Sequence, residues 1–325
     1  MMDAEKRPAP DCRIRIGTSG YSYAEWVDAG FYPPQMKAGR MLAFYAGCFS
    51  VTELNYTWYQ MPKAAAIERM QQQAPADFLF TAKLTRYLTH EVEPDQWRRH
   101  AAQYREGMAP LIQSGRLAAV LIQFPPSFVR NPCNRRYLAE LLDALHGLPA
   151  AVEFRHASWA AERVYRELEQ RSITLVSLDM PEINGLFPSL DIITNPDFFY
   201  IRFHGRNKKG WRSGNMQQQF DYDYTAAELR RWSEERLPAM AARTRRGFVF
   251  FNNHVRARAP ANALQLMQQL EQKGIGSHAF GTGHYSSQHC RFCRGGGACD
   301  GPSAQWSSGH HRSPDIGTGD GIRYE

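Results

Sequence analysis

The chain has 325 residues, a hydrophobic fraction of 43% and a formal net charge of +7, from 39 basic and 32 acidic residues. It has no apolar stretch near the ~18 residues that a transmembrane helix needs, and its first ten residues lack the apolar centre of a secretory signal peptide. We therefore expect a cytoplasmic protein that does not contact a membrane. The basic residues form no block of five, so the charge alone does not favour nucleic-acid binding.

Short apolar runs alternate along the chain with segments of helical periodicity. Such alternation predicts parallel strands covered by helices, because parallel neighbours need a crossover connection. Eight strand-helix units favour a TIM-like (β/α)₈ barrel, and a doubly wound open sheet is the alternative. The predicted strands are 13–19, 51–55, 78–83, 118–124, 150–155, 173–179, 198–204 and 248–253, and the predicted helices are 38–48, 63–73, 94–114, 135–145, 160–171, 225–243 and 261–272.

Two connections and both ends of the chain depart from this regular pattern. Segment 180–196 is rich in proline and predicts a degenerate crossover, whereas the long connection 205–224 is a candidate lid. We expect an N-terminal extension (1–12), a barrel domain (13–273) and a flexible tail rich in Gly, Ser, Cys and His (274–325). The tail holds ligand types that suit zinc, but only one CxxC pair: these are His284, His289, Cys290, Cys293 and Cys299.

Polar and ionisable residues stand at the ends of the predicted strands. Side chains two positions apart on a strand share a face, which pairs Glu53 with Asn55 and Arg202 with His204. In a barrel these ends form the mouth where active sites are built, so we predict one pocket there. A second interpretation is that the charged groups only neutralise one another. The predicted catalytic residues are Glu53, Glu153, Asp179 and His204, and the predicted substrate-binding residues are Tyr21, Trp26, Asn55, Tyr59, Lys83, Gln123, Arg155, Arg202, Arg206 and Asn252.

These residue types suit an enzyme that acts on a polar or anionic small molecule. Guanidinium and ammonium groups bind phosphate or carboxylate, the glutamates serve as acid or base, and His204 is a proton shuttle near neutral pH. A metal-assisted hydrolase or isomerase would place Mg²⁺, Mn²⁺ or Zn²⁺ on Glu53, Glu153, Asp179 and His204. A retaining glycosidase would need the two glutamate carboxyl groups about 5 Å apart. The alternative class is a non-catalytic barrel that binds a ligand or a nucleic acid.

A series of ordered motifs resembles the YecE-like family, domain of unknown function 72. The resemblance covers roughly residues 14–270 and implies a TIM-barrel-like fold, but it implies little chemistry because the family's activity is undefined. Trp58 stands where the family commonly has Phe, and the Cys-rich tail lies outside the resemblance. The motifs are GTSGYSY (17–23), ELNYTWY (53–59), Lys83 with Thr89 and His90, QFPPSF (123–128), EFRH (153–156), DMP (179–181), YIRFHGR (200–206) and FNN (251–253).

Overall fold

The structure is a computed structural model, and it describes residues 12–274. The expected extension up to residue 11 and the expected tail from residue 275, with its candidate zinc ligands, lie outside the described residues. Each predicted strand is present, and run 173–179 is divided at Val176 into two strands. The strands are β1 (Arg13–Thr18), β2 (Val51–Leu54), β3 (Leu79–Lys83), β4 (Leu117–Gln123), β5 (Ala150–Glu153), β6 (Thr174–Leu175), β7 (Ser177–Asp179), β8 (Phe198–Phe203) and β9 (Arg246–Phe251).

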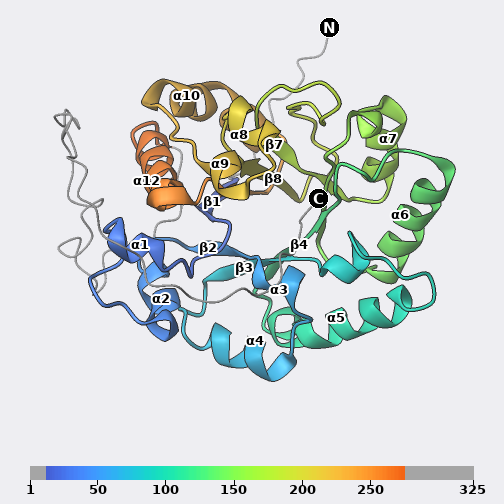
Figure 1. The fold of residues 1–325 in the computed structure, drawn as a ribbon, viewed down its shortest axis with the longest axis horizontal. Helices are drawn as coiled ribbons and strands as arrows, with labels where there is room; N and C mark the ends of the chain where they lie inside the picture. The colour runs from blue at the N-terminus through green and yellow to red at the C-terminus, as the bar shows by residue number, and fades with distance from the viewer. Residues whose placement is uncertain (1–11, 275–325) are drawn as a thin grey trace, which may run out of the picture.

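The predicted helices are also present, and they surround the strands (Figure 1). Their apolar faces pack inward, as amphipathic periodicity predicts. The α-helices are α1 (Glu25–Asp28), α2 (Ala38–Tyr45), α3 (Tyr56–Tyr59), α4 (Ala64–Gln71), α5 (Trp97–Gln113), α6 (Pro132–Ala144), α7 (Glu162–Gln170), α8 (Lys208–Arg212), α9 (Met216–Phe220), α10 (Ala226–Arg231), α11 (Leu237–Ala241) and α12 (Arg258–Glu271). Short 3₁₀ turns lie at Arg86–Leu88, Ala157–Trp159 and Val255–Ala257, and a π-helical turn, Trp232–Arg236, joins α10 to α11.

All strand pairs in the described part of the chain are parallel, and they form two sheets rather than one closed barrel. One sheet has the order β1-β9-β8-β7, and the other has the order β2-β3-β4-β5-β6. A single bridge, between Ser19 and Glu53, links the end of β1 to β2. The chain therefore has the predicted α/β architecture, but the strand pairing does not establish the predicted barrel closure.

Close packing of the first two strands depends on a glycine. A Cβ atom on Gly17 would lie 2.2 Å from the carbonyl oxygen of Val51, so no larger residue fits there without moving β1 away from β2. Most residues of the nine strands are buried, which explains why their sequences are continuous apolar runs. The core lies between these strands and the surrounding helices.

The two irregular connections take different forms. Segment 180–196 contains no helix, as its prolines predict, whereas segment 205–224 contains the short helices α8 and α9, which lie in front of the strands in Figure 1. Gly205 begins this second segment at φ +82°, where a Cβ atom would lie 2.5 Å from Cβ of Tyr222. Within the described residues, we find no helix with the length and apolar character needed to cross a membrane.

Candidate functional site

Three charged side chains from three strands meet in the interior of the molecule. Arg202 of β8 donates from Nε and Nη2 to the Glu53 carboxylate of β2, at 3.0 and 2.7 Å. Its Nη1 donates to Oε2 of Glu153 on β5 at 2.8 Å. One guanidinium therefore lies between two carboxylates, and all three side chains are buried.

Two further side chains complete this cluster, and the sequence analysis did not select them as site residues. The Tyr200 hydroxyl donates to Glu53 at 2.6 Å, and Arg202 Nη2 lies 3.4 Å from the Ser19 hydroxyl. Tyr200 precedes Arg202 by two positions on β8, so it lies on the same strand face. The alternation that grouped Arg202 with His204 was therefore the signal that identifies Tyr200 as well.

Arg155 and His204 extend the cluster beyond Glu153. Arg155 Nη2 lies 2.5 Å from Oε1 of Glu153 and 3.1 Å from Nε2 of His204. Because a guanidinium nitrogen only donates, Nε2 of the imidazole accepts this hydrogen bond. The other imidazole nitrogen, Nδ1, lies 3.0 Å from the side-chain amide of Asn252. The sequence therefore correctly grouped Glu53, Glu153, Arg155, Arg202, His204 and Asn252 in space.

The environment fixes the charge of each group in this cluster. Burial favours the neutral acid at Glu153, but the charges of Arg155 and Arg202 outweigh burial and hold the pKa of Glu153 well below its usual range. Burial, together with the charge of Arg155, lowers the pKa of His204 to about 3. His204 is therefore neutral at pH 7, which contradicts its predicted role as a shuttle that titrates near neutrality.

Two buried N–H donors beside the cluster have no hydrogen-bond partner among the described residues. They are Nε of Arg155 and the indole Nε1 of Trp211 in α8. The Arg155 guanidinium carbon lies 5.5 Å from the centre of the Trp211 ring, so the two side chains that carry these donors are neighbours. Rings of Trp211 and Phe220 also lie 6.2 and 6.1 Å from the His204 ring, which places segment 205–224 directly over this end of the cluster.

Lys83 lies at the end of β3 and is half-buried. Its Nζ lies 4.8 Å from the centre of the Trp58 ring. Burial and the charge of Arg202 lower the pKa of Lys83 to about 7, although Glu153 and Glu53 act in the opposite direction. Among the described residues, these two carboxylates make their ion pairs with Arg155 and Arg202 rather than with Lys83.

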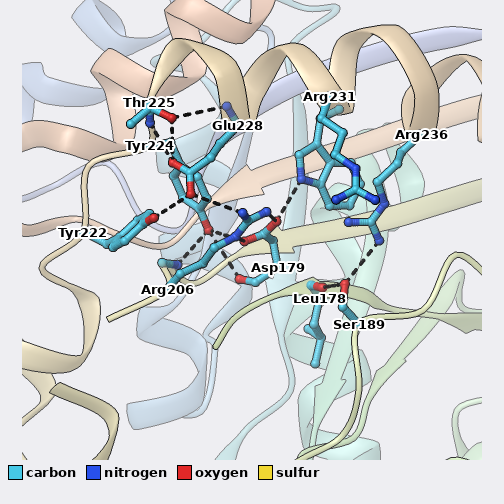
Figure 2. A network of polar contacts seen from close by, with 12 residues as sticks. Leu178, Asp179, Ser189, Arg206, Tyr222, Tyr224, Thr225, Glu228, Arg231 and Arg236 are labelled. Atoms are coloured by element: carbon cyan, nitrogen blue, oxygen red, sulfur yellow. Dashed lines mark hydrogen bonds and ion pairs between the residues drawn. The ribbon is translucent and has the colours of Figure 1, made fainter. Parts of the chain in front are cut away.

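Asp179 lies in a separate network, in which Figure 2 labels Asp179, Arg206, Tyr224 and Glu228. Trp232 also belongs to it, and we call these five residues the Asp179 network. Arg206 donates to both oxygens of Asp179, at 2.7 and 2.5 Å. The Tyr224 hydroxyl and the Trp232 indole donate to the same carboxylate, at 2.9 and 2.8 Å. Because Arg206 also pairs with Glu228, the network ties β7 to α10. The sequence predicted that Asp179 and Arg206 would lie with Glu53, Glu153 and Arg202. Their side chains instead form this second network.

The remaining predicted ligand-binding residues have varied surroundings. Trp26 is fully buried between aromatic rings, and its indole donates to the His254 carbonyl at 2.8 Å, so it packs the core. Gln123 is buried and donates to the Phe124 carbonyl at 2.8 Å. The other three predicted residues follow the ends of β1 and β2, and one of them, Tyr59, is 47% exposed. These three are Tyr21, Asn55 and Tyr59.

The described residues offer no metal site of the kind that the sequence suggested. Within residues 12–274, no three His, Cys, Asp or Glu side chains are grouped so as to hold a metal ion. Glu53 and Glu153 point their oxygens at arginines, while Asp179 lies in the other network. We therefore assign no metal to this cluster.

Comparisons with known proteins agree with the motif pattern. Residues 15–282 match the family model described as "Protein of unknown function DUF72". The UPF0759 protein YunF of Bacillus subtilis (strain 168) is 27% identical over 272 residues, which cover 79% of this chain and 95% of that protein. A DUF72 family protein of Thermotoga maritima MSB8 superposes with a TM-score of 0.73 at 34% identity, covering 80% of this chain and 99% of the other. A DUF72 family protein of Enterococcus faecalis V583 gives a TM-score of 0.72 at 27% identity, covering 79% and 95%.

Proposed function

We propose that this chain, which belongs to the DUF72 family, is an enzyme that acts on an anionic small molecule held by Arg155. The observation that carries the proposal is the pair of buried, unpartnered donors, Nε of Arg155 and Nε1 of Trp211. Buried polar groups are nearly always hydrogen-bonded, so an orphaned donor needs an explanation. The oxygens of a carboxylate or phosphate would satisfy these donors, because a guanidinium is the side chain best suited to such an anion.

Arg202, in contrast, is not a suitable ligand for the substrate. Each of its three nitrogens already faces an acceptor on Glu53, Glu153 or Ser19. Burial lowers the pKa of Arg202, but Glu153 and Glu53 outweigh that effect and raise it. We therefore revise the expectation that Arg202 binds the anion. Its role is to hold the two carboxylates in place, and Glu153 in turn positions Arg155.

An enzyme explains Lys83 better than a passive binding protein does. At pH 7 the site contains an ionised carboxylate on Glu153, a neutral imidazole on His204 and an amine whose pKa is about 7. A group that titrates near the working pH both gives and takes protons, which is what acid–base catalysis requires. Perturbed pKa values of this kind are concentrated at functional sites.

We also infer that the two sheets together form the wall of a TIM-like barrel within one domain, residues 13–273. Two features support this inference: the Ser19–Glu53 bridge joins β1 to β2, and only Val176 separates β6 from β7. In such a barrel, Glu53, Lys83, Glu153 and His204 stand at the carboxyl ends of their strands, where barrel enzymes carry their active sites.

Anion binding tests the proposal. Sulfate, phosphate and pyruvate, each at constant ionic strength, should raise the melting temperature, since a ligand at 100 Kd adds about 2.7 kcal/mol of stability. Trp211→Phe removes one orphan donor and keeps the ring, so it should fold normally and need a higher anion concentration. The matched control is Trp159→Phe, whose indole donates to the Phe128 carbonyl at 2.6 Å away from the cluster.

Two outcomes would overturn the proposal. If no anion stabilises the wild type, Arg155 has no ligand of this class. If Trp159→Phe weakens the anion response as much as Trp211→Phe, the response does not come from the site. Binding of an oligonucleotide, with an affinity that falls steeply with salt, would favour the nucleic-acid-binding alternative.

A further inference from the structure

We propose that Lys83 is the nucleophile of this site and that it forms an imine with a small aldehyde or ketone that carries a carboxylate or phosphate group. This inference rests on the proposed function, because Arg155 holds the anionic group of the same substrate. It adds the substrate class and the covalent step, neither of which follows from anion binding alone.

The Lys83 amine lies beside the cluster without a carboxylate partner among the described residues. Nζ of Lys83 lies over the face of Trp58, 4.8 Å from the ring centre, and the two nearby glutamates pair with other cations. The Trp58 indole donates to Nδ1 of His90 at 3.3 Å, so the ring is held in place. The cation–π contact with Trp58 favours the ammonium form, but no carboxylate among the described residues pairs with this half-buried amine, so loss of its proton breaks no ion pair.

Exposed aromatic side chains lie next to the Trp58 ring that this amine contacts. Tyr59 packs edge-on against Trp58, with ring centres 4.8 Å apart, and is 47% exposed. Tyr56, at the start of the same short helix α3, is 37% exposed. Exposed aromatic side chains beside a half-buried lysine suit the entry of a small polar substrate with an apolar carbon skeleton.

Burial, and after it the charges that face Lys83, explain why its pKa is lowered toward neutral pH. The carboxylates of Glu53 and Glu153 are matched by the guanidinium groups of Arg202 and Arg155, so a protonated Lys83 leaves this buried cluster with excess positive charge. His90 does not change that balance, because burial and the charge of Lys83 lower its pKa to about 3. Loss of a proton from Lys83 removes the excess.

The proposed step balances with one proton taken from solvent and one water released. The Nζ lone pair attacks the carbonyl carbon and forms a C–N bond, while the proton lost by nitrogen and the one gained by oxygen cancel. The carbinolamine oxygen then takes up a proton from solvent and leaves as water when the C–O bond breaks, giving the protonated imine. This cation draws electrons from the neighbouring carbon, which is the usual purpose of an imine in proton abstraction or C–C cleavage next to a carbonyl. The carboxylate or phosphate group of the substrate balances the positive charge of the protonated imine.

Reductive trapping tests the inference on the full chain. The protein is incubated with pyruvate or, separately, dihydroxyacetone phosphate, reduced with sodium borohydride, and mapped by peptide mass spectrometry. At pH 7 an amine of pKa about 7 is roughly half neutral, on the order of 10³ times more than an ordinary lysine. We expect at least about tenfold more reduced adduct on Lys83 than on the exposed Lys37 and Lys63 of the same molecules.

Controls separate this inference from the proposed function on which it rests. Lys83→Arg should abolish the adduct at this position, and Lys83→Met serves the same purpose if the arginine variant does not fold. Sulfate should compete with trapping at Lys83, because both use Arg155. If anions stabilise the wild type but Lys83 is labelled no more than Lys37 and Lys63, the imine is refuted and anion binding stands. If anions have no effect and Lys83 is still trapped, the anion site is refuted instead.

Discussion

Two buried carboxylate–arginine networks lie within one molecule, and they differ in whether their hydrogen bonds are complete. In the Asp179 network, both carboxylate oxygens receive protein donors, from Arg206, Tyr224 and Trp232 (Figure 2). In the cluster around Glu153, Nε of Arg155 and the neighbouring indole of Trp211 have no partner among the described residues. The complete network is suited to holding segments together, whereas the incomplete one is suited to receiving a ligand.

Loss of the carboxylate from the complete network should have the largest effect on stability. Asp179→Asn removes the negative charge that Arg206, Tyr224 and Trp232 share and leaves them one acceptor oxygen instead of two, and breaking a buried ion pair from one side costs about 3 kcal/mol or more. Urea denaturation at pH 7 measures the free energy of unfolding. The matched control, Asp197→Asn, removes an exposed ion pair with Arg245 and should cost less than about 1 kcal/mol. Equal losses in the two variants would show that the Asp179 network is not a structural anchor.

A smaller loss is expected from Tyr200→Phe in the other cluster. The Tyr200 hydroxyl lies 2.6 Å from Glu53 and 2.9 Å from the Thr81 hydroxyl. A hydrogen bond to a charged group contributes about 1.5–3 kcal/mol, so urea denaturation should show a loss in that range. Anion stabilisation should persist, because Tyr200 contacts Glu53 and not Arg155. A wild-type unfolding free energy in this variant would argue against the observed geometry around Glu53.

Lys83→Met should stabilise the protein, with a pH dependence that identifies the cause. The pKa of Lys83 is about 7 in the folded protein against the usual 10.5. Between these values the unfolded chain binds more protons, so this lysine's unfavourable contribution is full below pH 7 and fades as pH rises to 10.5. We expect a melting temperature at pH 6.5 that is higher by roughly 2–4 °C, or about 1 kcal/mol. A difference that does not shrink toward pH 10 would indicate a packing effect instead.

The sequence predicted those parts of the site that depend on strand alternation. Glu153 with Arg155, and Arg202 with His204, lie two apart at strand ends, and each pair came together in one cluster. Strand alternation does not show which side chains from distant parts of the sequence pack against a strand end. It therefore did not separate Asp179 from the cluster. That separation depends on Trp232, 53 residues further along the chain.

In the fold, too, local sequence patterns predicted the individual elements but not the contacts between distant segments. Apolar runs and helical periodicity predicted the elements and their order, including the irregular connection 180–196. They did not predict the interruption at Val176 or the strand pairing that gives two sheets. Trp26 follows β1 in a loop, where the sequence suggested a pocket wall. The carbonyl of His254, 228 residues away, holds its indole in the core.

A matched pair of arginine variants tests the central claim most directly. Arg155→Lys and Arg206→Lys each keep a positive charge beside a buried carboxylate and remove the guanidinium, and the thermal shift produced by sulfate is measured for both at constant ionic strength. Our account predicts that Arg206→Lys lowers the melting temperature but keeps the wild-type sulfate shift, whereas Arg155→Lys loses most of that shift. An equal sulfate shift in both variants and the wild type would contradict the claim that the incomplete network is the binding site.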